Sequence, residues 1–270
     1  MNDSPPRLAE RHNPATALSK KLWIYTNYDC HLRCTYCVAK STPTAARRGI
    51  EIDTIRRLVD EAVAIGFDEI FFTGGEPFML PDIFEMLSYS ADRVKTTVLT
   101  TGMLLKRKRM ESLRQIKSEN LTIQVSLDGG SAKAHDPYRG RDTWDATVEA
   151  VKRLTDHGFH VRLSTTETPA NTDSLTEICE FHLTLGIPEE DHFIRPLAKR
   201  GFSQEGINVS MKSINPAITV NREGVFWHPL STDEDMQISK CIFPLQNAVE
   251  CVEEQLKVIA AGGEPRINFT

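Results

Sequence analysis

The sequence predicts an α/β protein whose core is a partial (β/α)6 TIM-like barrel. Three observations support this prediction: short β-rich runs alternate with helical runs, the strand-like runs number six, and glycines end several helical runs. Strands that alternate with helices pair in parallel through right-handed crossovers, and six such units fit a partial barrel. A doubly wound sheet shows the same alternation, so periodicity leaves both architectures open. Both place an active site at the carboxyl ends of the strands.

The predicted strands are short runs rich in Ile, Val, Phe, Tyr or Thr. They are Leu22–Tyr28, Glu69–Thr73, Thr96–Thr101, Leu121–Leu127, His160–Thr165 and His192–Pro196. Between the first two strands, Leu58 and Ile65 belong to a helical i, i+3, i+4, i+7 pattern that Gly66 ends at its C′ position. Two later helices are expected from start and stop residues at Thr143, Gly158, Asn171 or Thr172, and Gly186.

The chain divides into three expected segments. They are a loose N-terminal arm at residues 1–20, the barrel core at residues 21–200 and a C-terminal extension at residues 201–270. The arm is rich in proline, with little apolar periodicity. In the extension the alternation gives way to a predicted hairpin, Ala217–Val220 with Gly224–Trp227, and a final helix over Pro244–Ala260.

Composition excludes several classes of protein. The chain has 37 acidic and 32 basic residues, a formal net charge of −5, so it lacks the basic field of non-specific nucleic-acid binding. Hydrophobic residues make up 40% and charged residues 26%, which excludes wholesale disorder. No apolar run reaches the roughly 18 residues of a membrane span, and no signal-peptide core is visible. Free cysteines without a signal peptide predict a cytoplasmic protein that has no membrane partner.

Three of the six cysteines form a C-x3-C-x2-C spacing directly after the first predicted strand: Cys30, Cys34 and Cys37. Three thiolates within one loop can converge on a soft metal centre. A [4Fe–4S] cluster usually takes four cysteines, so three would leave one iron open to a substrate or cofactor. Zinc held with His31 or a distant ligand is an alternative, although structural zinc sites usually pair two short clusters. A further alternative is that the three cysteines are grouped by chance and serve only as small hydrophobic residues.

At these residues the sequence resembles the radical S-adenosylmethionine (radical SAM) superfamily, whose members carry an aromatic residue, here Tyr36, just before the last cysteine. Four more motifs match in order along residues 21–200. They are Thr73-Gly74-Gly75-Glu76-Pro77, Thr100-Thr101-Gly102, Ser126-Leu127-Asp128-Gly129 and His135-Asp136-Pro137-Tyr138-Arg139-Gly140. The last two are similar to the subgroup of molybdenum-cofactor and peptide-modifying members. Together the motifs are specific, although any one alone is weak.

The resemblance implies that Cys30, Cys34 and Cys37 hold a [4Fe–4S] cluster and that SAM chelates the open iron. Reductive cleavage of SAM would then give methionine and a 5′-deoxyadenosyl radical, which abstracts hydrogen from a substrate. An electron donor such as flavodoxin or ferredoxin is implied as a partner.

Motif residues at the first strand ends are expected to bind SAM. Gly74 and Gly75 would let the backbone approach a ligand closely, because they have no Cβ. Glu76, held extended by Pro77, would accept from the SAM ammonium. Thr101 stands where members usually carry Asn, and it is a weaker cofactor contact.

Later motif residues are assigned to the rest of SAM. Ser126 and Asp128 alternate along a strand, so both would face the ribose hydroxyls. Arg139 would pair with the methionyl carboxylate, and Tyr36 would lie near the adenine. Four residues at or beyond the late strand ends are weaker candidates for contact with substrate, with a solvated loop position as the alternative. They are Thr165, Glu167, Arg195 and Arg200.

The C-terminal region resembles a degenerate SPASM or twitch extension. Ile218–Trp227 keeps the hairpin shape, but the cysteine array is missing, so Cys241 and Cys251 are not expected to hold an auxiliary cluster. The extension would cap the barrel mouth and exclude solvent. The leading function is a radical SAM enzyme acting on a small-molecule metabolite or a cofactor or natural-product precursor. A peptide-modifying maturase is the alternative, and a non-enzymatic zinc or iron–sulfur electron-transfer module is the rival from another class.

Overall fold

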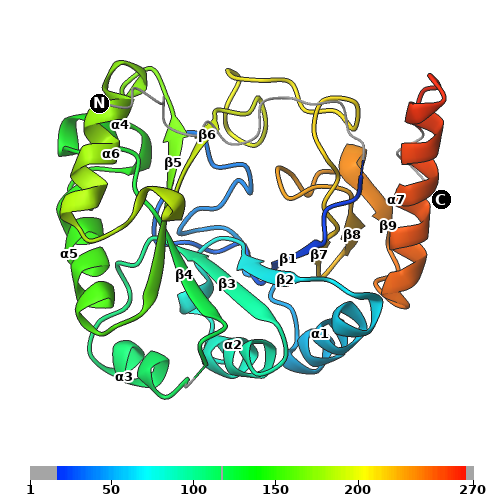
Figure 1. Cartoon of the computed structure of the whole chain (residues 1–270), viewed down its shortest axis with the longest axis horizontal. Helices are drawn as coiled ribbons and strands as arrows, with labels where there is room; N and C mark the ends of the chain where they lie inside the picture. Colours follow the sequence, from blue (N-terminus) through cyan, green and yellow to red (C-terminus); the bar gives the residue numbers. More distant parts are fainter. Residues whose placement is uncertain (1–16, 117, 266–270) are drawn as a thin grey trace.

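A nine-stranded sheet forms the frame of the protein. The computed structural model describes residues 17–116 and 118–265. The first six strands are parallel, and each one pairs with the next in the chain. They are β1 (Lys21–Tyr25), β2 (Glu69–Thr73), β3 (Lys95–Thr100), β4 (Leu121–Ser126), β5 (His160–Glu167) and β6 (His192–Pro196). The six predicted strands are therefore confirmed, with boundaries shifted by a few residues. The sheet curves into a barrel that does not close, since β6 and β9 are its two edges (Figure 1).

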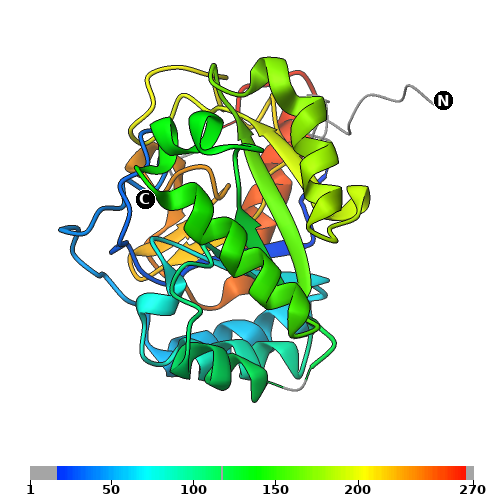
Figure 2. The same ribbon diagram turned by 90° about the vertical axis from the view of Figure 1, so that its left-hand side faces the viewer.

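Helices cover the outside of the curved sheet (Figures 1 and 2). They are α1 (Ile52–Ile65), α2 (Ile83–Ala91), α3 (Lys108–Arg114), α4 (Ala132–Arg139), α5 (Thr143–Asp156), α6 (Leu175–Thr184) and α7 (Leu245–Ala260). In α1 the buried residues include Leu58 and Val59 on one face, and Gly66 ends the helix with a φ of 97°, as the pattern predicts. These faces pack on the outward side chains of the strands, among them Ile24 and Phe72, which are fully buried.

The inner face of the sheet has different chemistry. Trp23 of β1 stacks on Phe71 of β2 with ring centroids 4.3 Å apart, and Ala217 joins this small apolar cluster. Towards the amino ends of the strands, the Arg162 guanidinium pairs with the Glu69 carboxylate at 3.1 Å. The floor of the half-barrel is thus sealed by apolar and paired groups, which leaves the carboxyl ends for function.

The C-terminal extension continues the same sheet. β7 (Thr219–Asn221) pairs in parallel with β1, and β8 (Gly224–Phe226) and β9 (Gln237–Ser239) add antiparallel strands. The predicted hairpin and final helix are confirmed, and α7 packs beside α1 (Figure 1). The division at residue 200 stays a prediction, and the predicted arm at residues 1–20 lies mostly outside the described residues.

No helix within residues 17–116 and 118–265 is long and apolar enough to cross a bilayer.

Candidate functional site

The loop between β1 and α1 carries the three motif cysteines at the carboxyl end of the sheet (blue in Figure 1). Backbone bonds fix its path: the Cys30 N–H donates to the Thr42 carbonyl at 3.1 Å, and the Ile50 N–H donates to the Thr26 carbonyl at 3.1 Å. The loop therefore folds back on itself and returns to the strand end where it began. Cys30 is buried, while Cys34 and Cys37 are half-buried.

The three thiols are free and lie in one neighbourhood. The Leu32 N–H points at the Cys30 sulfur and the Ser41 N–H at the Cys37 sulfur, each at 3.4 Å, and such donors stabilise thiolates. Burial raises the pKa of Cys30 to about 12, with Glu76, Cys34 and Cys37 adding to the rise, so the three sulfurs interact electrostatically. Metal binding would have to displace these protons.

The described residues contain no group of three or more His, Cys, Asp or Glu side chains placed to hold a single metal ion. Tetrahedral zinc on the cysteines with His31 therefore has no preformed site there. A four-iron cluster binds each thiolate through a different iron, so its ligands stand further apart than those of one ion. The three free thiols on one folded loop match the number of cysteine ligands that would leave one iron of such a cluster open.

Gly74 and Gly75 lie at a close contact between the end of β2 and the cysteine loop. A Cβ on Gly74 would lie 2.3 Å from the Asn27 carbonyl oxygen, and a Cβ on Gly75 would lie 2.1 Å from the Asp29 carbonyl oxygen. The Gly75 N–H donates to the Asn27 carbonyl at 2.8 Å. The glycines thus allow the β2 end to pack directly against the cysteine loop, and their contact with a ligand stays a prediction.

Glu76 is fully buried beneath this contact. Its carboxylate accepts hydrogen bonds from the Thr100 hydroxyl at 2.7 Å and from both the N–H and the hydroxyl of Thr101 at 2.9 Å. The Phe78 N–H adds a fourth donor, and the backbone before Pro77 is extended as predicted. An ammonium would have to displace one of these donors. Thr101 replaces Asn and still reaches this site, as a donor to Glu76.

Three residues expected to touch different parts of SAM bind one another. The Tyr36 hydroxyl donates to Asp128, and Arg139 donates to the Tyr36 hydroxyl at 2.6 Å and lies 3.5 Å from Asp128. The Thr166 N–H occupies the other Asp128 oxygen at 2.8 Å. Asp128 is fully buried and Arg139 nearly so. This triad joins the cysteine loop to β4 and α4, and the Cys34 thiol lies 3.9 Å from the Arg139 carbonyl.

Ser126, at the end of β4, is half-buried and has no side-chain hydrogen bond within the described part of the chain. Its hydroxyl is therefore open to a ligand. Thr165 is not: it is fully buried and donates to the Leu127 carbonyl at 2.7 Å, so it belongs to the core.

Sequence reasoning missed several polar residues that organise the site. The Asn27 side chain donates to the Asp29 carbonyl at 2.9 Å and to the Glu76 carbonyl at 3.1 Å, which ties two motifs together. His135 accepts from the Asp128 N–H at 3.1 Å, and Asn171 donates to the Asp128 carbonyl at 2.7 Å. His135 is the first residue of a motif in which only Arg139 was expected to bind a ligand. The sequence therefore did carry a signal for the histidine. The sequence marks Asn171 only as a possible helix start and Asn27 only as part of the first predicted strand.

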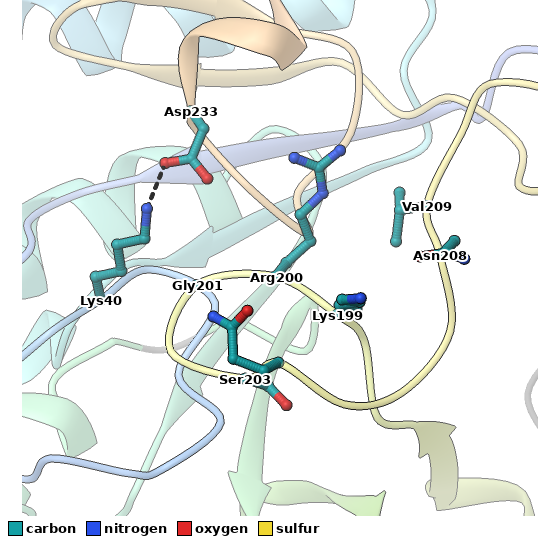
Figure 3. A pocket seen from close by; sticks show the side chains of 9 residues that line it. Lys40, Lys199, Arg200, Gly201, Ser203, Asn208, Val209 and Asp233 are labelled. Carbon is teal, nitrogen blue, oxygen red and sulfur yellow. Dashed lines mark hydrogen bonds and ion pairs between the residues drawn. The ribbon is translucent and has the colours of Figure 1, made fainter.

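A polar pocket of about 370 Å³ opens beside the cysteine loop (Figure 3). Lys40, three residues after the last cysteine, lines one side and pairs with Asp233 at 3.0 Å. Arg200 lines it from the segment after β6 and pairs with Asp235 at 2.6 Å. The Phe202 N–H donates to the Cys37 carbonyl at 3.1 Å, so this segment packs on the loop itself. The pocket therefore joins the cysteine loop, the β6 segment and the C-terminal extension.

A family model described as the radical SAM superfamily matches residues 24–181. The curated relatives include AdoMet-dependent heme synthase of Methanosarcina barkeri, 30% identical over 58% of this chain and 45% of its own. Another is the antilisterial bacteriocin subtilosin biosynthesis protein AlbA of Bacillus subtilis, 30% identical over 58% of this chain and 36% of its own. Mycofactocin maturase MftC of Mycolicibacterium smegmatis is 26% identical over 71% and 48%. The chain spans about half or less of the length of these relatives.

Solved structures share the fold. Streptococcus suis SuiB bound to S-adenosylmethionine superposes with a TM-score of 0.59 and 22% identity over 73% of this chain and 44% of SuiB. The structure of anSMEcpe with bound AdoMet and Cp18Cys peptide gives a TM-score of 0.52 and 17% identity over 65% and 50%.

Proposed function

Because the chain belongs to the radical SAM superfamily, we propose that it is an enzyme that cleaves SAM reductively to start a radical reaction. The superfamily uses a [4Fe–4S] cluster and SAM. One observation supports the proposal most: the family match contains all five motifs, and the first strands bring them together at one edge of the sheet.

The proposed cluster ligands are Cys30, Cys34 and Cys37. Their support is the set of free thiols, the N–H donors at two of the sulfurs and their shared electrostatic neighbourhood. When bound, the cluster would supply the electron that splits SAM into methionine and a radical that ends as 5′-deoxyadenosine. The protein's own part is to hold the loop rigidly against β2 and to keep water out.

We assign SAM to the edge formed by Glu76, Ser126 and the Tyr36–Asp128–Arg139 triad. The Ser126 hydroxyl is unpaired within the described residues, whereas Glu76 and the triad must exchange a protein partner for the ligand. Thr101 acts through Glu76 in this proposal. Gly74 and Gly75 act by admitting the cysteine loop.

We propose a small molecule as the substrate. The pocket of about 370 Å³ beside the cysteine loop lies within the roughly 300–1,000 Å³ typical of small-ligand sites. A peptide is the second candidate, because AlbA and MftC are a bacteriocin biosynthesis protein and a maturase. Residues 201–270 would cap the barrel mouth, and a cytoplasmic reductant such as flavodoxin or ferredoxin would deliver the electron.

Anaerobic reconstitution of the full chain tests the proposal. The protein is loaded with iron and sulfide and then given SAM and dithionite, and methionine and 5′-deoxyadenosine are quantified. Release of both products with a brown, iron-loaded protein is expected. A colourless, zinc-loaded protein that leaves SAM intact would favour the metal-binding module instead. Comparison of metabolites and peptides in cells with and without the protein would then separate the two substrate classes.

A further inference from the structure

Arg195 of β6 faces the inside of the half-barrel. Its neighbour Ile194 is buried on the helix-covered face, and side chains alternate along a strand. The Arg195 guanidinium lies 5.9 Å from the ring of Trp23 on β1, although four strands separate β6 from β1 in the sheet. The side chain therefore reaches across the inner face of the sheet.

This guanidinium has no hydrogen-bond or ion-pair acceptor in residues 17–116 and 118–265, and it lies over the Trp23 ring. The contrast with other inward arginines is clear: Arg162 pairs with Glu69, and Arg139 pairs with Asp128. Burial lowers the pKa of Arg195, although its side chain stays partly exposed. Its donors are therefore open to a ligand that supplies an acceptor.

His228 lies just beyond β8, and both of its chain neighbours contact β1 or a residue packed on it. The carbonyl of Trp227, the residue before it, accepts from the Ala217 N–H at 2.8 Å, and Ala217 packs on Trp23. The Tyr25 hydroxyl donates to the Pro229 carbonyl at 2.5 Å. These contacts hold the backbone on both sides of His228 next to β1.

The protonation of His228 follows from one hydrogen bond. Its Nδ1 accepts from the Leu230 N–H at 3.2 Å, so the neutral ring carries its proton on Nε2. Burial, with the nearby charge of Arg195, lowers the pKa of His228 to about 3, so the ring stays neutral at physiological pH. Both residues therefore offer hydrogen-bond donors, and the effect of the Arg195 charge on His228 indicates that they lie near each other.

We propose that Arg195 and His228 together bind an anionic group of the substrate, a carboxylate or a phosphate. Arg195 stands in register with Thr166, whose N–H binds Asp128 of the SAM edge, so the anion would be held next to that edge. A planar guanidinium suits both anions in bidentate geometry, and the imidazole N–H adds direction. This inference rests on the proposed function, because it names the chemical class of a substrate held beside the proposed SAM edge. Arg195 and His228 do not line the polar pocket at Lys40 and Arg200.

Ligand-observed NMR on the reconstituted, SAM-loaded full chain tests the inference. The probes are glutarate, inorganic phosphate and the neutral glutaramide at matched ionic strength. We expect one of the anions to bind at least tenfold more tightly than glutaramide, and which one binds distinguishes carboxylate from phosphate. Arg195→Ala should weaken that binding by about tenfold or more, and Arg195→Lys should recover part of it. Circular dichroism and a melting curve confirm that each variant is folded.

Arg222→Ala is the matched control, because Arg222 is exposed on the β7–β8 turn and its removal changes the net charge equally. Anion binding should not change in this variant. Equal binding of glutaramide and both anions, or wild-type anion binding by Arg195→Ala, would overturn the inference. Release of 5′-deoxyadenosine by the same wild-type sample is measured separately, so failure of SAM cleavage identifies a failure of the proposed function instead.

Discussion

The two sides of the barrel mouth differ in how their polar groups are satisfied. On the β1–β4 side, the buried carboxylates of Glu76 and Asp128 are surrounded by donors from the protein itself. On the side formed by β6 and the C-terminal extension, Arg195 and His228 offer donors that meet no acceptor among the described residues. In the proposed function, the first side would be preorganised for a constant cofactor. The second side would bind a variable ligand, which is where enzymes of one family would diverge.

The largest effect is expected from removing a thiol on the preorganised side. Cys34→Ala should abolish the brown colour and reduce SAM cleavage to the background rate, because the proposed cluster loses one of its three ligands. Absorbance, iron content and 5′-deoxyadenosine measure this. Cys241→Ala, which removes an exposed cysteine, should behave as wild type. Normal cleavage by Cys34→Ala would show that the cluster assignment is wrong.

Gly75→Ala should separate the cysteine loop from β2. The new Cβ would lie 2.1 Å from the Asp29 carbonyl oxygen, so the backbone must move at a cost of roughly 3 kcal/mol. We expect a lower midpoint in urea and reduced iron loading. Gly49→Ala, in the same loop, is the control, since its Cβ would meet nothing nearer than 3.6 Å. If both variants load iron equally, the tight contact is unimportant for the site.

Glu76→Gln tests whether the buried carboxylate is a fixed anchor. Both carboxylate oxygens of Glu76 accept hydrogen bonds, so the amide nitrogen of the variant would face a donor instead of an acceptor. We therefore expect a loss of stability on the order of 1–3 kcal/mol together with a raised KM for SAM. Chemical denaturation and the SAM dependence of cleavage measure the two effects. Glu253→Gln on the exposed face of α7 should change neither. A raised KM with unchanged stability would instead indicate that Glu76 acts on the ligand alone.

Sequence periodicity predicted the strands well because each outward face is apolar and each strand ends at a polar motif. It missed α4, because Pro137 lies inside that helix and removes a backbone donor that a helix normally uses. It also assigned Tyr36, Asp128 and Arg139 to three parts of a ligand. These residues lie up to 103 positions apart, and only the folded chain shows that they bind one another.

The glycines illustrate the same limit. The sequence predicts that Gly74 and Gly75 let the backbone approach a ligand closely, and it gives no sign of the protein contact at the same positions. That contact is with the backbone of Asn27 and Asp29, and its position depends on the register of β1 against β2. A pattern that is local in sequence predicts a local conformation, whereas the contact it serves is tertiary.

The smallest effect concerns an unpaired polar group that faces away from the barrel interior. Both nitrogens of His182 are buried without a hydrogen bond in the described residues, and its ring packs edge-on against His192. Burial lowers the pKa of His182 to about 3, with the charge of His192 adding to the shift. Between pH 6.5 and 3 the unfolded chain binds more protons there, so stability falls as the pH falls through that window.

His182→Phe should weaken this acid sensitivity while leaving stability at pH 7.5 within about 1 kcal/mol of wild type. Urea unfolding at pH 7.5 and 5 measures the difference. The exposed His157→Phe should keep the wild-type pH dependence. An effect of His182→Phe on glutarate or phosphate binding would show that this helix-side group of α6 is coupled to Arg195 at the barrel mouth.

The cysteine loop is bonded to residues synthesised long after it. The Tyr28 hydroxyl binds Thr232 at 2.6 Å and accepts from Asn221 at 2.7 Å, while Lys40 pairs with Asp233. A ribosome that has just released the three cysteines has therefore not yet made the partners that hold their loop in place. With the proposed cluster ligands, stable insertion of iron and sulfide would follow the emergence of about residue 233 from the exit tunnel, so maturation of this site would be a late event for the nascent chain.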